Sequence, residues 1–384
     1  TGYPPATGGA QLHAHYLNQH LTKRGHQVSV HAHWNEIRFD WLRGTTLDSP
    51  PPSSYEIDGI PVNILSLSNQ QREAVKSSVR FYYLNQNNAI KNISSKLLLH
   101  LRAGKSDPDI IHNIRMGREP ISFASLQLAR ENKLPFVFTP LHHPRWSTPL
   151  HRHFHDLYRK ADAVFALTNW EKDELIRLGV SANNIHIIGH GPVLDKDANA
   201  DQFRKQYNLH GSIVLFLAQK FKYKGFKSLL QAASLVWKEK PDTHFVFMGP
   251  RTKYSNKIFA NIKHDHIHEI GRVDLAEKSS ALLAADILCV PSTQESFGGV
   301  FLEGWLTGCA VIGGTAPAVS EVIADGEDGY TVAQDPIIIA DRIITLLHEP
   351  DRRNSMVENG RKKVEQLYTW DKIAERVEIV YKSL

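Results

Sequence analysis

Cysteine is scarce in this chain, and its scarcity limits how the fold can be held together. Only Cys289 and Cys309 occur among 384 residues, and both lie in apolar stretches. A small buried thiol is the usual state of such a residue. Two cysteines in a chain of this length make no disulfide framework, which favours a reducing compartment. We therefore expect a cytoplasmic protein.

Long hydrophobic runs and two nucleotide-binding fingerprints are also missing. No apolar run approaches the roughly 20 residues that a membrane span needs. Neither GxGxxG nor GxxxxGK[ST] occurs, which argues against a nicotinamide-dinucleotide enzyme and a P-loop NTPase. Dense Lys/Arg runs interleaved with aromatic residues are absent too, so we predict no nucleic-acid partner.

Positive charge is concentrated in the first half of the chain. Residues 1–190 hold 21 Lys and Arg against 15 Asp and Glu, a net charge of +6. Residues 191–384 hold 24 against 25, a net charge of −1, and the sum is the +5 of the whole chain. A basic half is typical of proteins that meet acidic or phosphorylated substrates or a membrane surface.

Short apolar segments alternate with helical patterns in two successive series. Each apolar segment is bounded by Gly, Pro, Asp or Asn, which indicates βαβ units and buried parallel sheets. The first series predicts strands at Gln27–Ala32, Ile60–Leu65, Ile110–His112, Pro135–Thr139 and Ala163–Leu167. The second predicts strands at Ser212–Ala218, His244–Met248, Ile267–Ile270, Ile287–Val290 and Ala310–Ile312. Helices are predicted at Gly9–Lys23, Ile121–Asn132, Glu171–Leu178, Gly225–Glu239, Lys278–Ala285, Val300–Leu306 and Trp370–Leu384.

The length suggests two domains of the usual size. The polar stretch Gly191–Asn208 lies between the two series and is predicted to be a linker. We expect a Rossmann-like domain over residues 1–190, a second over residues 191–368 and a terminal helix over residues 369–384. Both domains are expected to be doubly wound and to face a common cleft. Since the sequence opens on a glycine-rich loop, TGYPPATGG, we also expect a short strand to precede it.

Two carboxylates separated by a glycine pair form the most informative motif, ESFGGVFLE. Glu295 and Glu303 follow the predicted strand Ile287–Val290, and ligands bind at the carboxyl ends of such strands. Gly298 and Gly299 allow backbone N–H groups to approach a ligand, and the helix that begins there favours an anion. The alternative is an ordinary strand–turn–helix with surface carboxylates.

Three histidines, His151, His153 and His155, suggest a metal site at first sight. His151 and His155 have the i, i+4 spacing of zinc ligands on a helix, but no Glu in register and no Cys accompany them. We predict a solvated, histidine-rich helix and no metal.

The motif ESFGGVFLE resembles the E-x7-E motif of retaining glycosyltransferases of family 4, which have the GT-B fold. Segments that resemble the same family occur in its order along nearly the whole chain: TGYPPATGGAQLHAHYLNQHLTKRGHQVSV, ADAVFALTNWEKDELIRLGVSANNIHIIGHG, YKGFKSLLQA, FVFMGP, EIGRV, ILCVPSTQESFGGVFLEGWLTGCAVIGG and VSEVIADGEDGYTV. The resemblance implies that residues 369–384 cross back onto the first domain.

The resemblance also implies roles for individual residues. Glu295 would position the donor sugar and Glu303 would hold the ribose hydroxyls. Lys224 would neutralise the donor diphosphate. Backbone groups would contact the donor at Phe297, Gly298, Gly299 and Val300, at the base-reading segment Gly271, Arg272 and Val273, and at the first-domain glycines Gly8 and Gly9.

The sequence departs from the family pattern at three places. Gln219, followed by Lys220, stands where the family often has Arg, so Lys220 either supplies the missing charge or belongs to a solvated basic turn. His142 and His143 are both candidates for a histidine that contacts the donor, while Leu141 occupies the commoner histidine position. His112 is a weaker candidate, and His190 replaces the usual Asn at the hinge between domains.

The resemblance implies a metal-independent retaining hexosyltransferase. The first domain would bind the acceptor and the second a nucleotide-sugar, with UDP-glucose the first expectation because UDP-sugars are the commonest donors in the family. The expected acceptor is a glycan or a lipid-linked glycan, reached at the inner face of a membrane. The helical stretch Asn88–Arg102 either rests on that membrane or packs its apolar side on the domain. The alternatives are an epimerase of the same fold and a non-catalytic nucleotide-sugar-binding protein.

Overall fold

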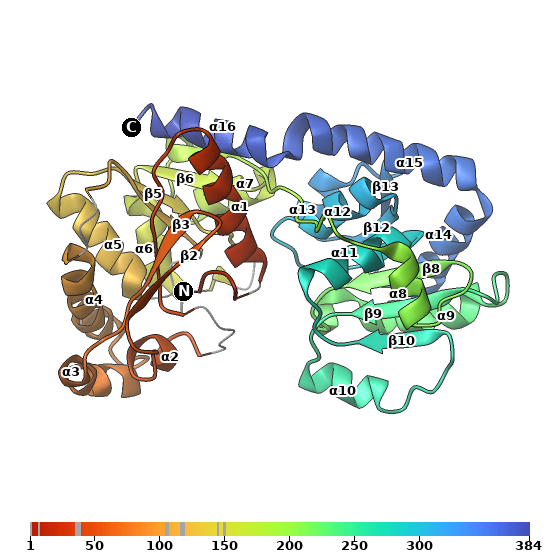
Figure 1. Ribbon diagram of the computed structural model, residues 1–384, viewed down its shortest axis with the longest axis horizontal. Helices are drawn as coiled ribbons and strands as arrows, with labels where there is room; N and C mark the ends of the chain where they lie inside the picture. The colour runs from red at the N-terminus through yellow and green to blue at the C-terminus, as the bar shows by residue number, and fades with distance from the viewer. Residues whose placement is uncertain are drawn as a thin grey trace. The chain divides into compact units, whose positions relative to one another are not determined.

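A computed structural model describes residues 2–6, 8–34, 40–103, 107–115, 120–143, 146–148 and 151–384. The chain forms two units, Thr1–Gly189 with Trp370–Leu384 and His190–Thr369 (Figure 1). Both are α/β units whose sheets are built mainly of parallel strands, as the sequence predicts. In the described ranges, no helix has the length and apolar character needed to cross a membrane.

The second unit contains one six-stranded sheet in the order β10-β9-β8-β11-β12-β13, and every neighbouring pair is parallel. Numbered along the chain, this order is 3-2-1-4-5-6, the doubly wound arrangement in which strand order reverses between β8 and β11. Ligands bind such sheets outside the carboxyl ends of the two strands that flank the reversal. The strands are β8 (Ile213–Leu217), β9 (His244–Met248), β10 (Ile267–Ile270), β11 (Ile287–Val290), β12 (Ala310–Gly314) and β13 (Gly329–Val332).

Helices of the second unit follow most of its strands. β8, β9 and β11 are nearly continuous apolar runs that are buried along their length, because helices cover both faces of a parallel sheet. The helical elements are α8 (Ala200–Gln206), η4 (Lys222–Lys224), α9 (Phe226–Val236), α10 (Lys253–Phe259), α11 (Leu275–Ala284), α12 (Gly299–Thr307), α13 (Pro317–Val322), α14 (Pro336–His348), α15 (Pro350–Lys363) and the π-helical turn η5 (Val364–Tyr368).

The stretch predicted to be a linker, Gly191–Asn208, is an integral part of the second unit. Helix α8 lies inside it and packs against α11. Asp195 and Asn199 donate backbone N–H groups to the hydroxyls of Ser279 and Ser280, each at 2.9 Å. The linker prediction is therefore wrong. The segment is polar like a linker, but it contains a helix and is bound to α11 by side-chain hydrogen bonds.

The first unit contains two sheets among its described residues. A four-stranded sheet, β4-β5-β6-β7, is parallel throughout, and a three-stranded sheet has the order β1-β3-β2. The strands are β1 (Val30–Ala32), β2 (Ser53–Ile57), β3 (Ile60–Ile64), β4 (Ile111–Ile114), β5 (Phe136–Thr139), β6 (Ala163–Ala166) and β7 (Ile185–Ile187). The helical elements are α1 (Gly9–Lys23), α2 (Arg43–Thr46), α3 (Asn69–Arg80), α4 (Gln86–Arg102), α5 (Pro120–Glu131), α6 (Arg152–Lys160), α7 (Asn169–Arg177), η3 (Ala182–Asn184) and α16 (Trp370–Tyr381).

Strand β2 is antiparallel to β3 and departs from the all-parallel prediction. A two-residue turn joins the two strands, and both of its residues, Asp58 (φ 50°) and Gly59 (φ 75°), have positive φ. Asp-Gly is a preferred sequence for such hairpin turns because both positions need φ above zero. The sequence signal was present, but β2 itself is mostly exposed and lacks an apolar run.

Helix α4 settles how the stretch Asn88–Arg102 is used. Its apolar residues pack in a core shared with α3 and α5. Leu99 is half-exposed, while Ile93 and Leu97 are fully buried. The prediction of a domain helix is confirmed. Most of the apolar residues that would have to face a membrane are buried in the core of the unit.

Helix α16 belongs to the first unit and lies beside α1 (Figure 1). The Trp370 ring stacks on Tyr16 at 5.7 Å between ring centroids. Arg24 forms an ion pair with Glu378, and the hydroxyl of Tyr381 lies 2.6 Å from Nδ1 of His112. The last helix thus covers part of the first unit's core.

Candidate functional site

The carboxyl ends of β8 and β11 place Lys224 near Glu295 in the second unit. Lys224 belongs to the turn η4 after β8, and Glu295 lies in the loop after β11. Because β8 and β11 are neighbours in the sheet, residues 71 positions apart meet at the point where strand order reverses. This is the edge at which a doubly wound sheet binds its ligand.

Lys224 and Glu295 form an ion pair, with Nζ and Oε1 2.5 Å apart and both side chains largely buried. The two loops that carry them are tied together, since the backbone N–H of Thr293 donates to the carbonyl of Tyr223 at 2.9 Å. Gly225 has φ +79°, and a Cβ there would lie 2.5 Å from the carbonyl oxygen of Pro291. Close backbone contact therefore fixes the geometry of this pair.

Glu303 is held by a second ion pair, which its sequence context does not predict. Its Oε1 accepts from Nζ of Lys278 at 2.8 Å and from the backbone N–H of Val193 at 3.1 Å. The side chain is 9 % exposed, so Glu303 is no surface carboxylate. Lys278 lies 25 residues before Glu303 on another helix, and no local pattern links the two.

The glycine pair shapes the beginning of α12. Gly298 is the N-cap residue with φ +95°, and as a glycine it supplies no side-chain cap. A Cβ at Gly299 would lie 2.4 Å from Cδ2 of His190, so that only glycine fits beneath the ring. Val300, one residue further on, is partly exposed. The positive end of α12 is thus left open to an anion.

His190, which was expected at the hinge between the domains, lies against the start of α12. Its ring meets the buried ring of Phe297 edge to face, with 5.7 Å between centroids. Burial, with a smaller contribution from the nearby charge of Lys278, lowers the pKa of His190 to about 4. The imidazole is therefore neutral at physiological pH.

Lys220 does not occupy the open position that the sequence suggested. Its ammonium is fully buried, donates to the carbonyls of Gly249 and Ile270 at 2.5 and 2.7 Å, and pairs with Glu269 at 2.6 Å. Burial lowers its pKa despite that partner. An ammonium that is fully buried and held by two carbonyls and a carboxylate is not accessible to a diphosphate. Gln219, by contrast, is exposed.

The segment Gly271–Val273 follows β10 at the same carboxyl edge of the sheet. Gly271 and Arg272 are exposed and Val273 is partly exposed. The carbonyl of Gly271 accepts a backbone hydrogen bond from Gly249 at 3.0 Å, which ties the segment to the end of β9. The segment is therefore anchored and accessible, two strands away from β8 in the sheet.

In the first unit, His142 and His143 follow β5 but have different surroundings. His142 is fully buried, with Nε2 2.9 Å from Oγ of Ser147, and its backbone N–H donates to buried Glu171 at 2.5 Å. Burial lowers the pKa of His142 to about 4 and raises that of Glu171 to about 7. His143 is partly exposed, so its side chain is the more accessible of the two.

The other predicted residues of the first unit lie within β4 and at the start of α1. His112 is committed on both sides, to Tyr381 and to Oγ1 of Thr139 at 2.7 Å, which gives it a structural role. Gly8 is the N-cap residue of α1, and Gly9 is its first residue and is exposed. As a glycine, Gly8 supplies no side-chain cap to the backbone N–H groups of the first turn, which have no partner within the helix.

The prediction of a solvated histidine-rich helix at His151–His155 is wrong. His153 and His155 on α6 are buried, and Nε2 of His155 lies 3.0 Å from the carbonyl oxygen of Trp146. Within the described ranges, no group of three His, Cys, Asp or Glu side chains is placed to hold a metal ion. Both cysteines are buried, and burial raises the pKa of Cys309 to about 12.

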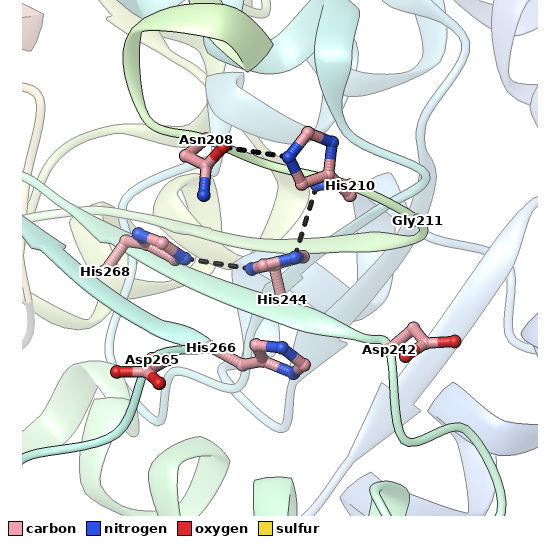
Figure 2. A pocket seen from close by; sticks show the side chains of 8 residues that line it. All are labelled: Asn208, His210, Gly211, Asp242, His244, Asp265, His266 and His268. Atoms are coloured by element: carbon pink, nitrogen blue, oxygen red, sulfur yellow. Dashed lines mark hydrogen bonds between the residues drawn. The ribbon is translucent and has the colours of Figure 1, made fainter.

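A histidine-lined hollow of about 320 Å³ lies at the opposite, amino ends of β8, β9 and β10 (Figure 2). The backbone N–H of His210 donates to Nε2 of His244 at 3.2 Å. Since Nε2 accepts, neutral His244 carries its proton on Nδ1 and donates it to Nε2 of His268 at 2.9 Å. Both ring nitrogens of His244 are therefore occupied. The hollow is lined by Asn208, His210, Gly211, Asp242, His244, Asp265, His266 and His268.

Two family models match the chain in succession. The first, Glycosyltransferase Family 4, matches residues 7–196, and the second, Glycosyl transferases group 1, matches residues 197–363. The boundary between them lies within the segment that α11 holds.

Curated relatives match this chain over about half its length. The phosphatidyl-myo-inositol mannosyltransferase of Mycobacterium tuberculosis is 32 % identical over 204 residues, which cover 51 % of this chain and 53 % of the relative. The D-inositol 3-phosphate glycosyltransferase of Corynebacterium diphtheriae is 28 % identical, over 59 % of this chain and 57 % of that protein. The chain thus matches little more than half the length of each of these relatives.

Solved structures match over the whole chain at low identity. Anabaena Alr3699/HepE in complex with UDP-glucose has a TM-score of 0.74 at 15 % identity, covering 100 % of this chain and 99 % of that one. Sucrose-phosphate synthase of Thermosynechococcus elongatus has a TM-score of 0.75 at 18 % identity, covering 100 % and 95 %. With the two models accounting for residues 7–363, the chain belongs to the GT-B glycosyltransferases of family 4 and group 1.

Proposed function

We propose that this chain is a metal-independent retaining hexosyltransferase that uses a UDP-sugar, with UDP-glucose the first donor to test. The observation that carries the proposal is the pair of buried ion pairs, Lys224–Glu295 and Lys278–Glu303, at the open end of α12. These groups lie at the edge where a doubly wound sheet binds ligands. The resemblance of ESFGGVFLE to the E-x7-E motif supports the same assignment.

The reaction requires positive charge near the bond between the anomeric carbon and the phosphate oxygen of the donor. The acceptor oxygen bonds to the anomeric carbon, the bond from that carbon to the phosphate oxygen breaks, and a nucleoside diphosphate leaves. In a retaining transfer the acceptor proton passes to the departing phosphate oxygen on the same face. Lys224 and the N–H groups of Gly299 and Val300 would stabilise the growing negative charge without a metal.

The two carboxylates would orient the donor sugar and the nucleoside. Glu295 would accept hydrogen bonds from the sugar hydroxyls, and Glu303 would accept them from the vicinal ribose hydroxyls. Gly271–Val273 would contact the base through the backbone, and exposed Gln219 would face the diphosphate where the family often has Arg. Phe297 and Gly298 would support these contacts by shaping the start of α12.

We assign the acceptor to residues 1–190, which hold the excess positive charge. Gly8, Gly9 and the accessible His143 are the proposed contacts, whereas buried His142 would support the loop. The Mycobacterium tuberculosis relative is named for a phosphatidyl-myo-inositol acceptor, which supports an anionic lipid-linked acceptor at the inner face of a membrane. The same name supports a mannosyl donor as the second candidate.

Calorimetric binding of UDP, GDP and ADP in the presence of a chelator tests the donor site first. We expect UDP to bind most tightly and the affinity to survive chelation. Turnover with the matching nucleotide-sugars then distinguishes the alternatives, because an epimerase would act without an acceptor and a binding protein would not turn over. Absence of binding for all three nucleotides would overturn the proposal, and preference for GDP would move the donor to a mannosyl-type nucleotide-sugar.

Anomeric configuration tests the retaining assignment separately. The product of a turnover reaction, analysed by proton NMR, should keep the configuration of the donor. An inverted product would contradict the E-x7-E assignment while leaving the donor site intact.

A further inference from the structure

We infer that Lys278 is a positioning residue that aims the free oxygen of Glu303 at the ligand and links it to the segment that opens the second unit. The inference rests on the proposed function, because it concerns the same carboxylate. It assigns a role to a residue that has no place in the motif ESFGGVFLE.

The first observation is the unequal use of the two oxygens of Glu303. Oε1 receives both hydrogen bonds, from Nζ of Lys278 and from the backbone N–H of Val193. Among the described residues, Oε2 receives none. A carboxylate held in this way has one oxygen fixed by the protein and the other left to accept from hydroxyl groups.

The second observation is that the ammonium of Lys278 joins two elements. Besides Glu303 it donates to the carbonyl of Val193 at 2.6 Å, so Val193 and Lys278 together surround Oε1. The next residue, Ser279, holds the backbone N–H of Asp195. One turn of α11 therefore holds both the carboxylate and the chain segment beside it.

The third observation concerns burial. The side chains of Glu303 and Lys278 are 9 % and 18 % exposed, and Val193 is 2 % exposed. In such a place a carboxylate that loses its cation keeps a single backbone donor and becomes free to rotate. Lys278 would thus affect ligand binding through Glu303, without touching the ligand.

The test compares a nucleotide with its 2′,3′-dideoxy analogue by calorimetry. Whichever of UDP, GDP and ADP binds most tightly is used. For the wild type we expect the dideoxy analogue to bind at least about tenfold more weakly, since charge-assisted hydrogen bonds to Glu303 are lost. Lys278→Met should weaken the ribonucleotide by a similar factor and leave the analogue unchanged, so that the two affinities converge.

Three further variants make the result specific. Ser279→Ala is the matched control, because it removes a hold on the same segment without touching Glu303, and it should keep the wild-type ratio of affinities. Lys278→Arg keeps the positive charge and should retain most of the wild-type ratio between the affinities for the nucleotide and its analogue. Lys278→Gln carries the same comparison if Lys278→Met does not fold, with circular dichroism as the check.

Equal weakening of both ligands by Lys278→Met would overturn the inference and show a merely structural lysine. The inference would be overturned as well if Lys278→Met changed neither affinity. Failure of the wild type to bind any nucleotide would overturn the proposed function itself. If Glu303→Gln removes the discrimination while Lys278→Met does not, the proposed function stands and only the role of Lys278 falls.

Discussion

At the carboxyl end of β8, Lys220 is committed to buried acceptors, whereas Lys224 lies beside Glu295 at the edge of the sheet. Lys224→Met should therefore lower kcat by about 100-fold or more, the usual effect of removing a charged group that stabilises a transition state. Single-turnover kinetics with the UDP-sugar measures the chemical step directly. Lys222→Met, an exposed change on the same turn, is the control and should keep the wild-type rate. Similar losses in both variants would indicate disruption of the turn.

The contact between Gly299 and His190 makes a prediction about stability. Gly299→Ala would place a methyl carbon 2.4 Å from Cδ2 of His190, closer than van der Waals contact allows. The substitution should cost about 1–3 kcal/mol of unfolding free energy, as overpacking usually does. Urea denaturation measures this loss. Gly271→Ala is the control, since nothing lies within 4 Å of a Cβ there. Adding His190→Gly to Gly299→Ala should recover part of the stability, and an additive loss would contradict the steric explanation.

Residues of the candidate site differ in whether their positions could be predicted from the neighbouring sequence. The placement of Glu295 and Glu303 near the carboxyl end of β11 could be predicted because the motif, the strand before it and the helix after it are contiguous. Lys278 could not, because its partner lies on another helix and the pairing exists only after folding. Lys220 was misjudged for a related reason, since sequence does not show which way a lysine at a strand end turns.

At the scale of elements, the histidine-lined hollow should make the sheet of the second unit sensitive to acid. Burial, together with the neighbouring rings of His266, His268 and His210, lowers the pKa of His244 to about 4; Asp242 and Asp265 also line the hollow. The unfolded chain, with an ordinary histidine pKa of 6.5, binds more protons between these values. Stability is therefore present above pH 6.5 and is lost as pH falls toward 4.

Protonation also breaks the hydrogen-bond arrangement around His244. A proton on Nε2 would face the backbone N–H of His210, donor against donor. His244→Gln should reduce the loss of unfolding free energy between pH 7 and pH 5 by at most about 2 kcal/mol. Urea midpoints at the two pH values measure it. The exposed change His348→Gln should leave the loss unchanged, and an identical loss in all three proteins would contradict the assignment.

Elements with continuous apolar runs were predictable, and some elements whose polarity is mixed were not. The strands β9 and β11 have the predicted bounds because each is a short, mainly apolar run with clear ends, and β10 has them although its sequence, IHEI, is half polar. Strand β2 and helix α8 were missed because their exposed, polar residues resemble a loop. Tertiary hydrogen bonds, such as those from Asp195 and Asn199 to α11, stabilise what local propensity does not.

At the scale of the whole molecule, the last helix should matter more to the first unit than to its sequence neighbours. Trp370 is 6 % exposed and stacks on Tyr16, so Trp370→Ala should destabilise the first unit by about 3–5 kcal/mol. Hydrogen exchange should show faster exchange in α1 and unchanged exchange in α12. Leu367→Ala, an exposed change three residues away, is the control. Faster exchange confined to the second unit would contradict this packing.

The place of α16 in the first unit also has a consequence for biosynthesis. A ribosome completes residues 190–369, a contiguous unit, before it releases the helix Trp370–Tyr381 that covers α1. The usual order, in which an N-terminal domain finishes folding first, is therefore reversed for the last packing step. Until translation reaches the final helix, the nascent first unit exposes the aromatic surface around Tyr16, which is the kind of surface that chaperones bind.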